Sequence, residues 1–151
     1  MLIQEWGNAT WFLFHTLSYK LKDIESNHAK ELLYLFVGIC RNLPCPVCRE
    51  DANKMLNGSN TPAVTTKSDL IRFMWQFHNL VNDKLDKPKI TLKEHNEKFA
   101  KANTNSVVKF YIHTMSKNAN NSTAMLDSFK RQDNTREFTD YIRVNSYRFN
   151  Q

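Results

Sequence analysis

The residues with the clearest chemical potential are Cys45 and Cys48, three positions apart in the run Cys45-Pro46-Val47-Cys48. Leu43-Pro44 should end the preceding helix, because proline disfavours a helical residue before it. Pro46 suits the first position of a new helix, and residues 49–56 are good helix formers, so Cys45 is predicted near an N-cap. Backbone N–H groups at that end stabilise a thiolate, and the pair can close a reducible disulfide. The predicted chemistry is thiol–disulfide exchange.

A C-x-x-C pair alone is compatible with three kinds of site. A thioredoxin-like motif should follow a strand, whereas the segments on either side here are helical in pattern. A structural zinc site would need Cys40 and a histidine, but a second close ligand pair is absent and Cys40 lies on an apolar helix stripe. The third interpretation is a dithiol site that works with a bound organic cofactor. A zinc-stabilised helical adaptor stays open as an alternative function.

Two further segments could bind such a cofactor. Trp11, His15 and Tyr19 recur at i, i+4 and i+8, so they share a helical face on which a flat ligand could stack, although burial in the core explains the neighbouring Phe and Leu residues. A second helix is predicted from about residue 66 to Pro88, with an apolar face between Leu70 and Leu85. Its polar side carries His78, Asn79, Asn82, Lys84 and Lys87. From the pattern alone, these polar residues could equally satisfy loop backbones.

The elements that must position these residues are helices. The chain has 151 residues with only 3 Gly and 4 Pro, too little turn punctuation for a strand-rich fold of this size, so an all-α protein is expected. Further helices are predicted from Ala29 through Cys40, after a Ser26-Asn27 cap, and over about 91–102 and 106–115. Residues 117–136 are polar and are interpreted as a linker or mobile segment. The aromatic stretch 138–149 is interpreted as a docking helix or the start of a further domain.

Composition excludes several classes of protein. No apolar run reaches the roughly 18 to 20 residues of a membrane span, and the N-terminal residues lack the pattern of a secretory signal, so neither membrane insertion nor secretion is expected. Three cysteines are too few for a disulfide-stapled scaffold. The net charge of +6 is diffuse, so no nucleic-acid partner is expected, although a helical nucleic-acid-binding module remains an alternative.

The order and spacing of these motifs resemble a known family. The matching runs are Gly7-Asn8-Ala9-Thr10-Trp11-Phe12-Leu13-Phe14-His15 with Tyr19, Leu43-Pro44-Cys45-Pro46-Val47-Cys48, and residues 78–88 from His78-Asn79 to Lys87-Pro88. Over about residues 6–100 the chain is similar to the Erv/ALR FAD-linked sulfhydryl oxidases, and most similar to the short forms encoded by large DNA viruses. The resemblance implies a four-helix bundle with a short fifth helix holding FAD, usually as a dimer. It divides the chain into an oxidase domain, 1–104, and a C-terminal helical or linker extension, 105–151.

The resemblance also implies residue roles. Cys45 would be the interchange cysteine that a substrate thiolate attacks, and Cys48 the cysteine beside the flavin. The implied cofactor-binding residues are Gly7, Trp11, His15 and Tyr19 in the first helix, Arg41 before the cysteine pair, His78, Asn79, Val81, Asn82, Lys84 and Lys87, and Lys98-Phe99 in place of the family's Arg-Trp pair. Cys40 is expected to be buried packing.

Two departures from the cellular members shape the expected function. Trp75 and Leu92 stand where those members carry a structural disulfide, so an apolar contact is expected there. No cysteine pair exists outside Cys45 and Cys48 to act as a shuttle, so a protein dithiol substrate, or a separate dithiol shuttle protein, must reach Cys45. The implied activity is FAD-dependent oxidation of protein dithiols with molecular oxygen as acceptor and hydrogen peroxide as product. The implied location is the host cytoplasm or the virion.

Overall fold

The computed structural model describes residues 3–22, 27–57, 63–117 and 122–151. Within these ranges the chain is helical, with one 3-10 turn and one isolated bridge between Leu21 and Phe149, and the predicted all-α class is confirmed. The elements are α1 (Ile3–Lys20), α2 (Asn27–Cys40), α3 (Pro46–Leu56), α4 (Lys67–Lys84), α5 (Leu92–Ala100), α6 (Thr104–Met115), α7 (Ser122–Asn145) and the 3-10 turn η1 (Ser146–Arg148).

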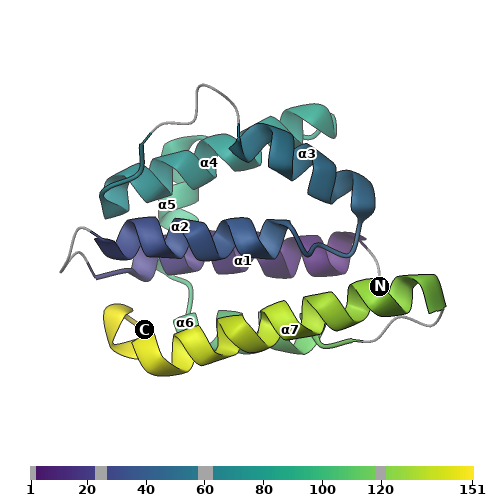
Figure 1. Cartoon of the computed structure of the whole chain (residues 1–151). Helices are drawn as coiled ribbons and strands as arrows, with labels where there is room; N and C mark the ends of the chain where they lie inside the picture. Colours follow the sequence, from purple (N-terminus) through teal and green to yellow (C-terminus); the bar gives the residue numbers. More distant parts are fainter. Residues whose placement is uncertain (1–2, 23–26, 58–62, 118–121) are drawn as a thin grey trace.

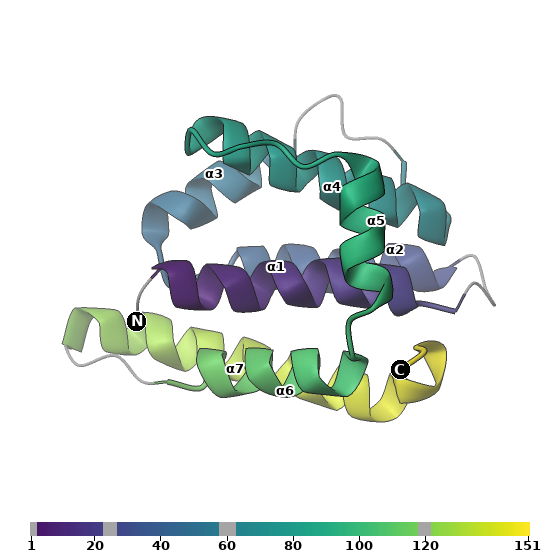
Figure 2. The ribbon, with the colours of Figure 1, turned by 180° about the vertical axis from the view of Figure 1, so that it is seen from behind.

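The helices form three layers, with α1 and α2 in the middle (Figure 1). Helices α3 and α4 lie on one side of this middle layer, and α6 and α7 lie on the other. Seen from behind, α5 crosses the end of α1 between these outer layers (Figure 2). Helix α1 packs against α6, α4, α5 and α2, which makes it the central helix of the molecule.

Side-chain caps fix the starts of the helices that carry the site. Thr66 and Asp69 form a capping box at α4, and Thr91 and Glu94 form the same box at α5. Cys45 is the N-cap of α3, and Pro46 occupies its first turn, as predicted. The predicted Ser26 cap of α2 lies outside the described residues.

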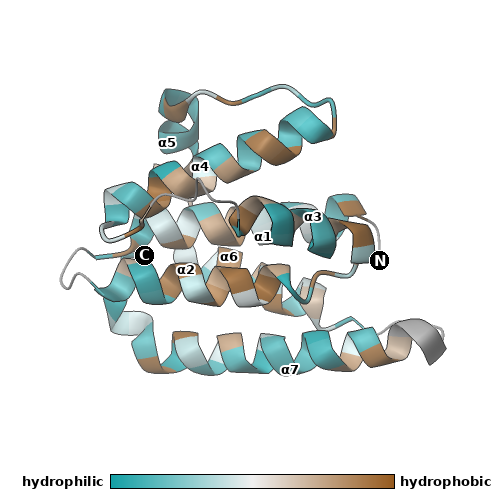
Figure 3. Ribbon diagram, turned by 45° about the horizontal axis from the view of Figure 1, so that its top comes forward, coloured by the Kyte–Doolittle hydropathy of each residue, from teal (hydrophilic) through white to brown (hydrophobic). Residues whose placement is uncertain are grey.

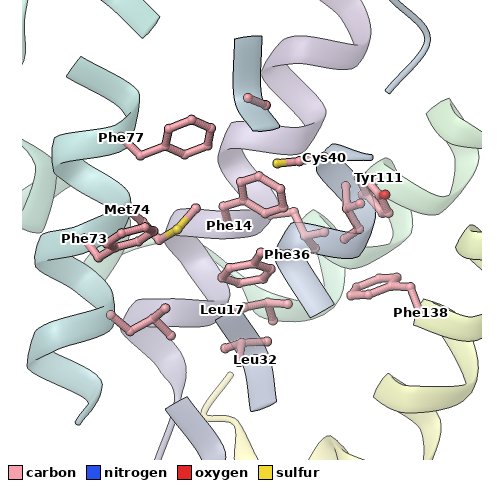
Figure 4. Close-up of a cluster of buried hydrophobic side chains, with 14 of the residues drawn as sticks. Phe14, Leu17, Leu32, Phe36, Cys40, Phe73, Met74, Phe77, Tyr111 and Phe138 are labelled. Atoms are coloured by element: carbon pink, nitrogen blue, oxygen red, sulfur yellow. The ribbon is translucent and has the colours of Figure 1, made fainter. Parts of the chain in front are cut away.

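One hydrophobic core joins all three layers. Phe14 and Leu17 of α1 face Leu32 and Phe36 of α2, with the α4 side chains Phe73, Met74 and Phe77 on one side and Tyr111 and Phe138 on the other (Figure 4). The rings of Phe14 and Phe36 are 4.5 Å apart, and those of Tyr111 and Phe138 meet edge to face at 5.2 Å. Residues beyond 104 therefore share their apolar contacts with the first two helices.

The interpretation of residues 117–136 as a linker is wrong for residues 122–136, which belong to α7, the longest described helix; residues 118–121 lie outside the described part. The buried face of α7 carries Ser128, Arg131, Thr135 and Phe138, spaced by three, four and three residues. This helical period is carried mostly by polar side chains, so a search for apolar periodicity does not detect it. Figure 3 shows the correspondingly mixed colouring of α7.

The end of α7 is tied back to the end of α1. The Lys22 N–H donates to the Arg148 carbonyl at 2.7 Å, and the Asn150 N–H donates to the Lys20 carbonyl at 2.8 Å. Residues 138–149, predicted as a docking element, thus complete α7 and close against the same fold. None of the helices in the described ranges combines the length and apolarity that crossing a bilayer requires.

Candidate active site

Cys45 and Cys48 form a disulfide at the start of α3, with their Cα atoms 5.2 Å apart. Cys45 has extended backbone angles, and its Sγ accepts a hydrogen bond from the Cys48 N–H at 3.2 Å. Both residues are half-buried, so the bond lies at the surface but is flanked by protein. The free N–H groups of the first turn and the helix dipole favour negative charge on sulfur at this position. The geometry is that of a reducible dithiol.

Arg49 links the cysteine pair to the C-terminal helix. Its guanidinium donates to the Leu43 carbonyl at 2.7 Å and pairs with the Asp127 carboxylate at 3.2 Å. The residue therefore bridges the segment before Cys45 and the first turns of α7. Helix α7 contributes in this way to the surroundings of the disulfide.

A cavity of about 440 Å³ lies behind Cys48. The disulfide pair reaches it through Cys48, and α1, α3 and α4 supply most of its wall. Six predicted site residues line it: Cys48, Gly7, Trp11, Val81, Lys84 and Lys87. Most of its remaining wall is apolar, including Phe14, Leu43 and Phe77. A concave, mainly apolar site with a few polar groups is typical of cofactor binding.

Trp11 lies between the cavity and a pair of histidines. Its ring stacks on His78 at 3.9 Å between centroids, with an angle of 8° between the planes. His78 Nδ1 is 2.8 Å from His15 Nε2, so one of the two nitrogens donates a hydrogen bond to the other. The Phe99 ring packs 4.8 Å from His15, and the Lys98 ammonium lies 4.9 Å from the centre of the Phe12 ring. Parallel aromatic planes of this kind suit a planar ligand.

The histidines of this group are held in their neutral form. Burial lowers the pKa of His15 well below its ordinary value, and the neighbouring imidazoles and Lys98 act in the same direction. Burial is also the main cause that lowers the pKa of His78 to about 4, with His95, Lys98 and Lys87 adding to the effect. Neutral imidazoles give this group of residues uncharged polar ring atoms beside the cavity.

Three observations test whether a dinucleotide fits here. A Cβ built on Gly7 would meet no other protein atom within 4 Å, so the cavity wall is open at that point of α1. Lys84 pairs with Asp51 across the cavity, and Lys87 lines it with an exposed ammonium, which gives cationic groups near the mouth. The Nδ1 of His15 is buried without a hydrogen-bond partner. An apolar pocket, a stacking ring and two lysines match a flavin ring with an anionic pyrophosphate.

Other predicted residues lie away from the cavity. Asn79 exchanges two hydrogen bonds with the backbone of Ile90, at 2.9 and 3.0 Å, so its amide positions the loop before α5. Asn82 is buried, and its carbonyl accepts from the Lys87 N–H at 2.8 Å. Tyr19 lies two turns beyond Trp11, with the Lys67 ammonium 5.8 Å from its ring centre.

Arg41 is exposed at the end of α2 and is not among the residues that line the cavity. Tyr19 is likewise not among the residues that line the cavity. Their cofactor roles stay predictions, as do those of Asn79 and Asn82.

Trp75 does tie α4 to the segment before α5, but through a polar contact. Its Nε1 donates to the Ile90 carbonyl at 2.7 Å. Leu92 is half-buried one residue beyond Thr91. The predicted apolar contact between Trp75 and Leu92 stays a prediction, and the observed tie is a hydrogen bond.

The sequence analysis missed several residues of the site. Asp51, Ala52 and Met55 line the cavity from α3, and their spacing from Cys48 by three, four and seven residues is the signal that places them on the same helical face. His95 of α5 lies 4.1 Å from His15 between ring centroids, and no motif pointed to it.

Cys40 is the third cysteine and takes no part in a disulfide. It is 2% exposed, and burial raises the pKa of its thiol to about 12. A thiol with this pKa stays protonated at neutral pH and is a poor nucleophile. The expected burial of Cys40 is confirmed, although its side chain also contributes to the cavity wall.

No group of three His, Cys, Asp or Glu side chains in the described ranges is placed to hold a metal ion. The zinc-adaptor alternative therefore finds no ligand set in that part of the chain.

The fold and the site define a class of helical redox protein in which a surface C-x-x-C disulfide borders a cofactor-sized cavity. A model of the Erv1 / Alr family matches residues 8–100, and the chain belongs to this family. The match covers α1 to α5 and stops before α6.

Individual relatives agree with this assignment. The chain is 34% identical over 91 residues to the mitochondrial FAD-linked sulfhydryl oxidase ERV1 of Saccharomyces cerevisiae, covering 58% of this chain and 46% of the yeast protein. It is 31% identical over 90 residues to the putative FAD-linked sulfhydryl oxidase 096R of invertebrate iridescent virus 3, covering 58% of this chain and 61% of the viral protein. Sulfhydryl oxidase 2 of Arabidopsis thaliana is 33% identical over 91 residues, which are 60% of this chain and 18% of the plant protein. The chain thus spans about half the length of the first two relatives and a smaller part of the third.

Proposed function

We propose that this protein is an FAD-dependent sulfhydryl oxidase that forms disulfides in protein dithiols. The observation that carries the proposal is the position of Cys48, which is bonded to Cys45 on one side and lines the cavity on the other. A disulfide with this placement can exchange electrons at the surface and deliver them inward. Membership of the Erv1 / Alr family and the FAD-linked names of the relatives support the same activity.

The dithiol step follows from the start of α3. A substrate thiolate attacks Cys45 Sγ, the bond between Cys45 and Cys48 breaks, and Cys48 leaves as a thiolate. The helix dipole and the first-turn N–H groups stabilise this leaving group. A second substrate thiolate then attacks the substrate sulfur of the mixed disulfide and releases Cys45. The substrate gains a disulfide, and the two electrons reside on the reduced Cys45 and Cys48 pair.

FAD bound in the cavity would supply a two-electron acceptor for the reduced cysteine pair, with molecular oxygen as the final acceptor and hydrogen peroxide as the product. The residues that would hold it are those of the cavity and the adjoining stack: Gly7, Trp11, His15, His78, Val81, Lys84, Lys87, Lys98 and Phe99. The neutral imidazoles present ring atoms for hydrogen bonding, and the lysines favour an anionic pyrophosphate. The apolar wall limits the access of water to Cys48 from the cavity side.

The proposal extends to partners and location. Because the chain has no second cysteine pair, a protein dithiol substrate or a separate dithiol shuttle protein must supply thiols to Cys45. We further propose that the protein forms a homodimer, that it is located in the host cytoplasm or the virion, and that it has no nucleic-acid partner. The viral relative supports the proposed location, and the mild, diffuse charge supports the absence of a nucleic-acid partner.

An absorbance spectrum and one variant test the function. The purified protein should take up FAD and become yellow, and it should consume oxygen with dithiothreitol as substrate. Cys48→Ser should abolish turnover while FAD stays bound, since the serine cannot pass electrons inward. Cys40→Ala is the matched cysteine control and should retain turnover. A protein that stays colourless with added FAD, or a Cys48→Ser variant that still consumes oxygen, would contradict the proposal.

A further inference from the structure

The imidazole of His95 is buried, and burial of an apolar side chain at this position would cost less free energy. It is 1% exposed, and in the described part of the chain neither of its ring nitrogens makes a hydrogen bond of good geometry, although the neighbouring Asn96 amide is near enough to favour a proton on the ring. Nearby, His15 Nδ1 and Asn96 Oδ1 are likewise buried without a partner. Buried polar atoms without partners destabilise a fold, so such a group needs an explanation.

The ring of His95 continues a chain of contacts that ends at the cavity. It meets the His15 ring edge to face at 4.1 Å and an angle of 89°. His15 Nε2 is hydrogen-bonded to His78 Nδ1 at 2.8 Å, and His78 stacks on Trp11 at 3.9 Å. Trp11 lines the cavity. Three helices, α5, α1 and α4, thus supply one imidazole each to a cluster directly beside the cofactor site.

The hydrogen bond between His15 and His78 constrains the charge of this cluster. One nitrogen must donate and the other must accept, so the bond cannot persist if both rings carry two protons. A first proton on either ring would place a cation in a buried site against the other imidazoles. Protonation of the cluster therefore opposes the stacked arrangement.

The charged groups that act on the cluster are cationic. Lys98 of α5 and Lys87 after α4 both oppose a further positive charge on its rings. The α5 carboxylates do not compensate, because Glu94 caps Thr91 and both Glu94 and Glu97 are exposed. Only the Asn96 amide favours a proton on His95.

The remaining packed helices do not supply a compensating charge either. On α4, the exposed Asp83 pairs with Lys89. On α1, the Glu5 carboxylate pairs with Lys117, more than two turns from His15. On α6, the titratable side chains Lys109 and His113 are exposed. The cluster is therefore stable only while its three imidazoles are uncharged.

We propose that His95 is a positioning residue of the FAD site, which acts through His15 on the His78–Trp11 stack and makes retention of the cofactor sensitive to acid. At neutral pH the three uncharged rings pack together and hold His78 against Trp11. In acid, the rings take up protons when the stack opens, and repulsion among three imidazoles then opposes closure. The inference rests on the proposed function, since it assumes that FAD occupies the cavity.

The sign of the effect follows from the lowered pKa values of the three rings. An imidazole released from the stack titrates near its ordinary pKa of about 6.5, whereas in the stack it stays neutral to lower pH. The closed arrangement is therefore favoured at pH values above about 6.5 and is progressively lost below it. At about pH 5, a ring that must remain neutral in the stack, such as His78 with its pKa of about 4, weakens FAD binding by a factor of about 30.

The test is the dissociation constant of FAD, measured by flavin fluorescence in the full chain at about pH 7.5 and about pH 5. Wild-type protein should lose affinity by about 30-fold or more between the two. For His95→Leu and His95→Gln, the ratio of the FAD dissociation constants at about pH 5 and about pH 7.5 should be several-fold smaller than for the wild type, because one titrating ring is gone. The glutamine variant keeps polar atoms at the position and so separates titration from packing. His113→Gln, on the exposed side of α6, is the matched control and should behave as wild type.

The outcomes separate this inference from the proposed function. Failure of the wild type to bind FAD at pH 7.5 would overturn the proposed function, and this inference with it. Binding that weakens less than about threefold at pH 5 would overturn the inference alone. The same would hold if both His95 variants lost affinity as steeply as the wild type does.

Discussion

Replacing Phe138 by alanine tests whether α7 belongs to the same cooperative unit as the active site. The Phe138 side chain is completely buried, and its ring meets Tyr111 edge to face at 5.2 Å. Tyr111 itself is 1% exposed and belongs to the core that α1 and α2 share. The substitution removes a phenyl ring from the junction between the outer layer and the middle layer (Figure 4).

The expected loss can be worked from this burial. A buried phenylalanine contributes roughly 150 to 200 Å² of apolar surface, which corresponds to about 4 kcal/mol at 25 cal/mol per Å². Loss of the edge-to-face contact and the cavity left behind keep the value within the range of about 3 to 5 kcal/mol measured for Phe→Ala in cores. For a chain of this size, the melting temperature should fall by about 10 °C.

The assay is urea unfolding followed by circular dichroism and by tryptophan fluorescence. All three tryptophans of the chain lie outside α7, at positions 6, 11 and 75, so fluorescence reports the cavity side of the molecule. Both signals should shift together to lower urea in Phe138→Ala. Phe129→Ala, at a position 54% exposed on the same helix, is the control and should change stability by less than about 0.5 kcal/mol. A loss below about 1 kcal/mol, or a fluorescence transition that does not move, would refute the shared core.

Two further predictions concern cysteine chemistry and helix capping. Burial raises the pKa of the Cys40 thiol to about 12, so iodoacetamide should not label this thiol in the native protein at about pH 8. Labelling, measured by mass spectrometry, should appear only when the protein unfolds. Rapid labelling of the native protein would show that the thiol is accessible. Thr91→Ala removes the capping box with Glu94 and should lower the free energy of unfolding by about 1 kcal/mol. Thr65→Ala, outside a cap position, is the control and should lower the free energy of unfolding by less. Equal losses in denaturant titrations would argue against the assigned cap.

The fold could be predicted where local signals and burial agree. The starts of α3, α4 and α5 were predictable because Pro46, Thr66 and Thr91 stand at strong N-terminal positions before apolar stripes. Helix α7 was not, because its buried positions carry a serine, an arginine and a threonine. Hydrogen bonds satisfy part of this face. One terminal nitrogen of Arg131 donates to the Lys117 carbonyl in a neighbouring segment and to the Ser128 hydroxyl one turn away. Tertiary contacts that satisfy polar atoms leave no apolar period in the sequence.

The residues of the site also differ in whether the sequence could predict their positions. Cys45 and Cys48 could be placed side by side from their spacing, because the geometry of one helix start fixes their relative positions. His95 could not, since its nearness to His15 depends on how α5 crosses α1 (Figure 2). Asn79 carried a plausible ligand-binding motif, yet its amide holds the Ile90 backbone. Residue type at a given spacing therefore predicted that Cys45 and Cys48 lie together at the start of a helix, but it did not indicate which tertiary contacts surround the site.

The hydrogen bond from the Cys48 N–H to Cys45 Sγ bears on how the proposed oxidase would turn over. A thiolate accepts such a bond more strongly than a disulfide sulfur does, so the contact that caps α3 when the cysteines are joined is available again when they separate. The first turn of the helix then keeps its cap in both oxidation states. Repeated opening and closing of the disulfide can proceed as a local movement of two sulfur atoms, without refolding of the backbone that carries them.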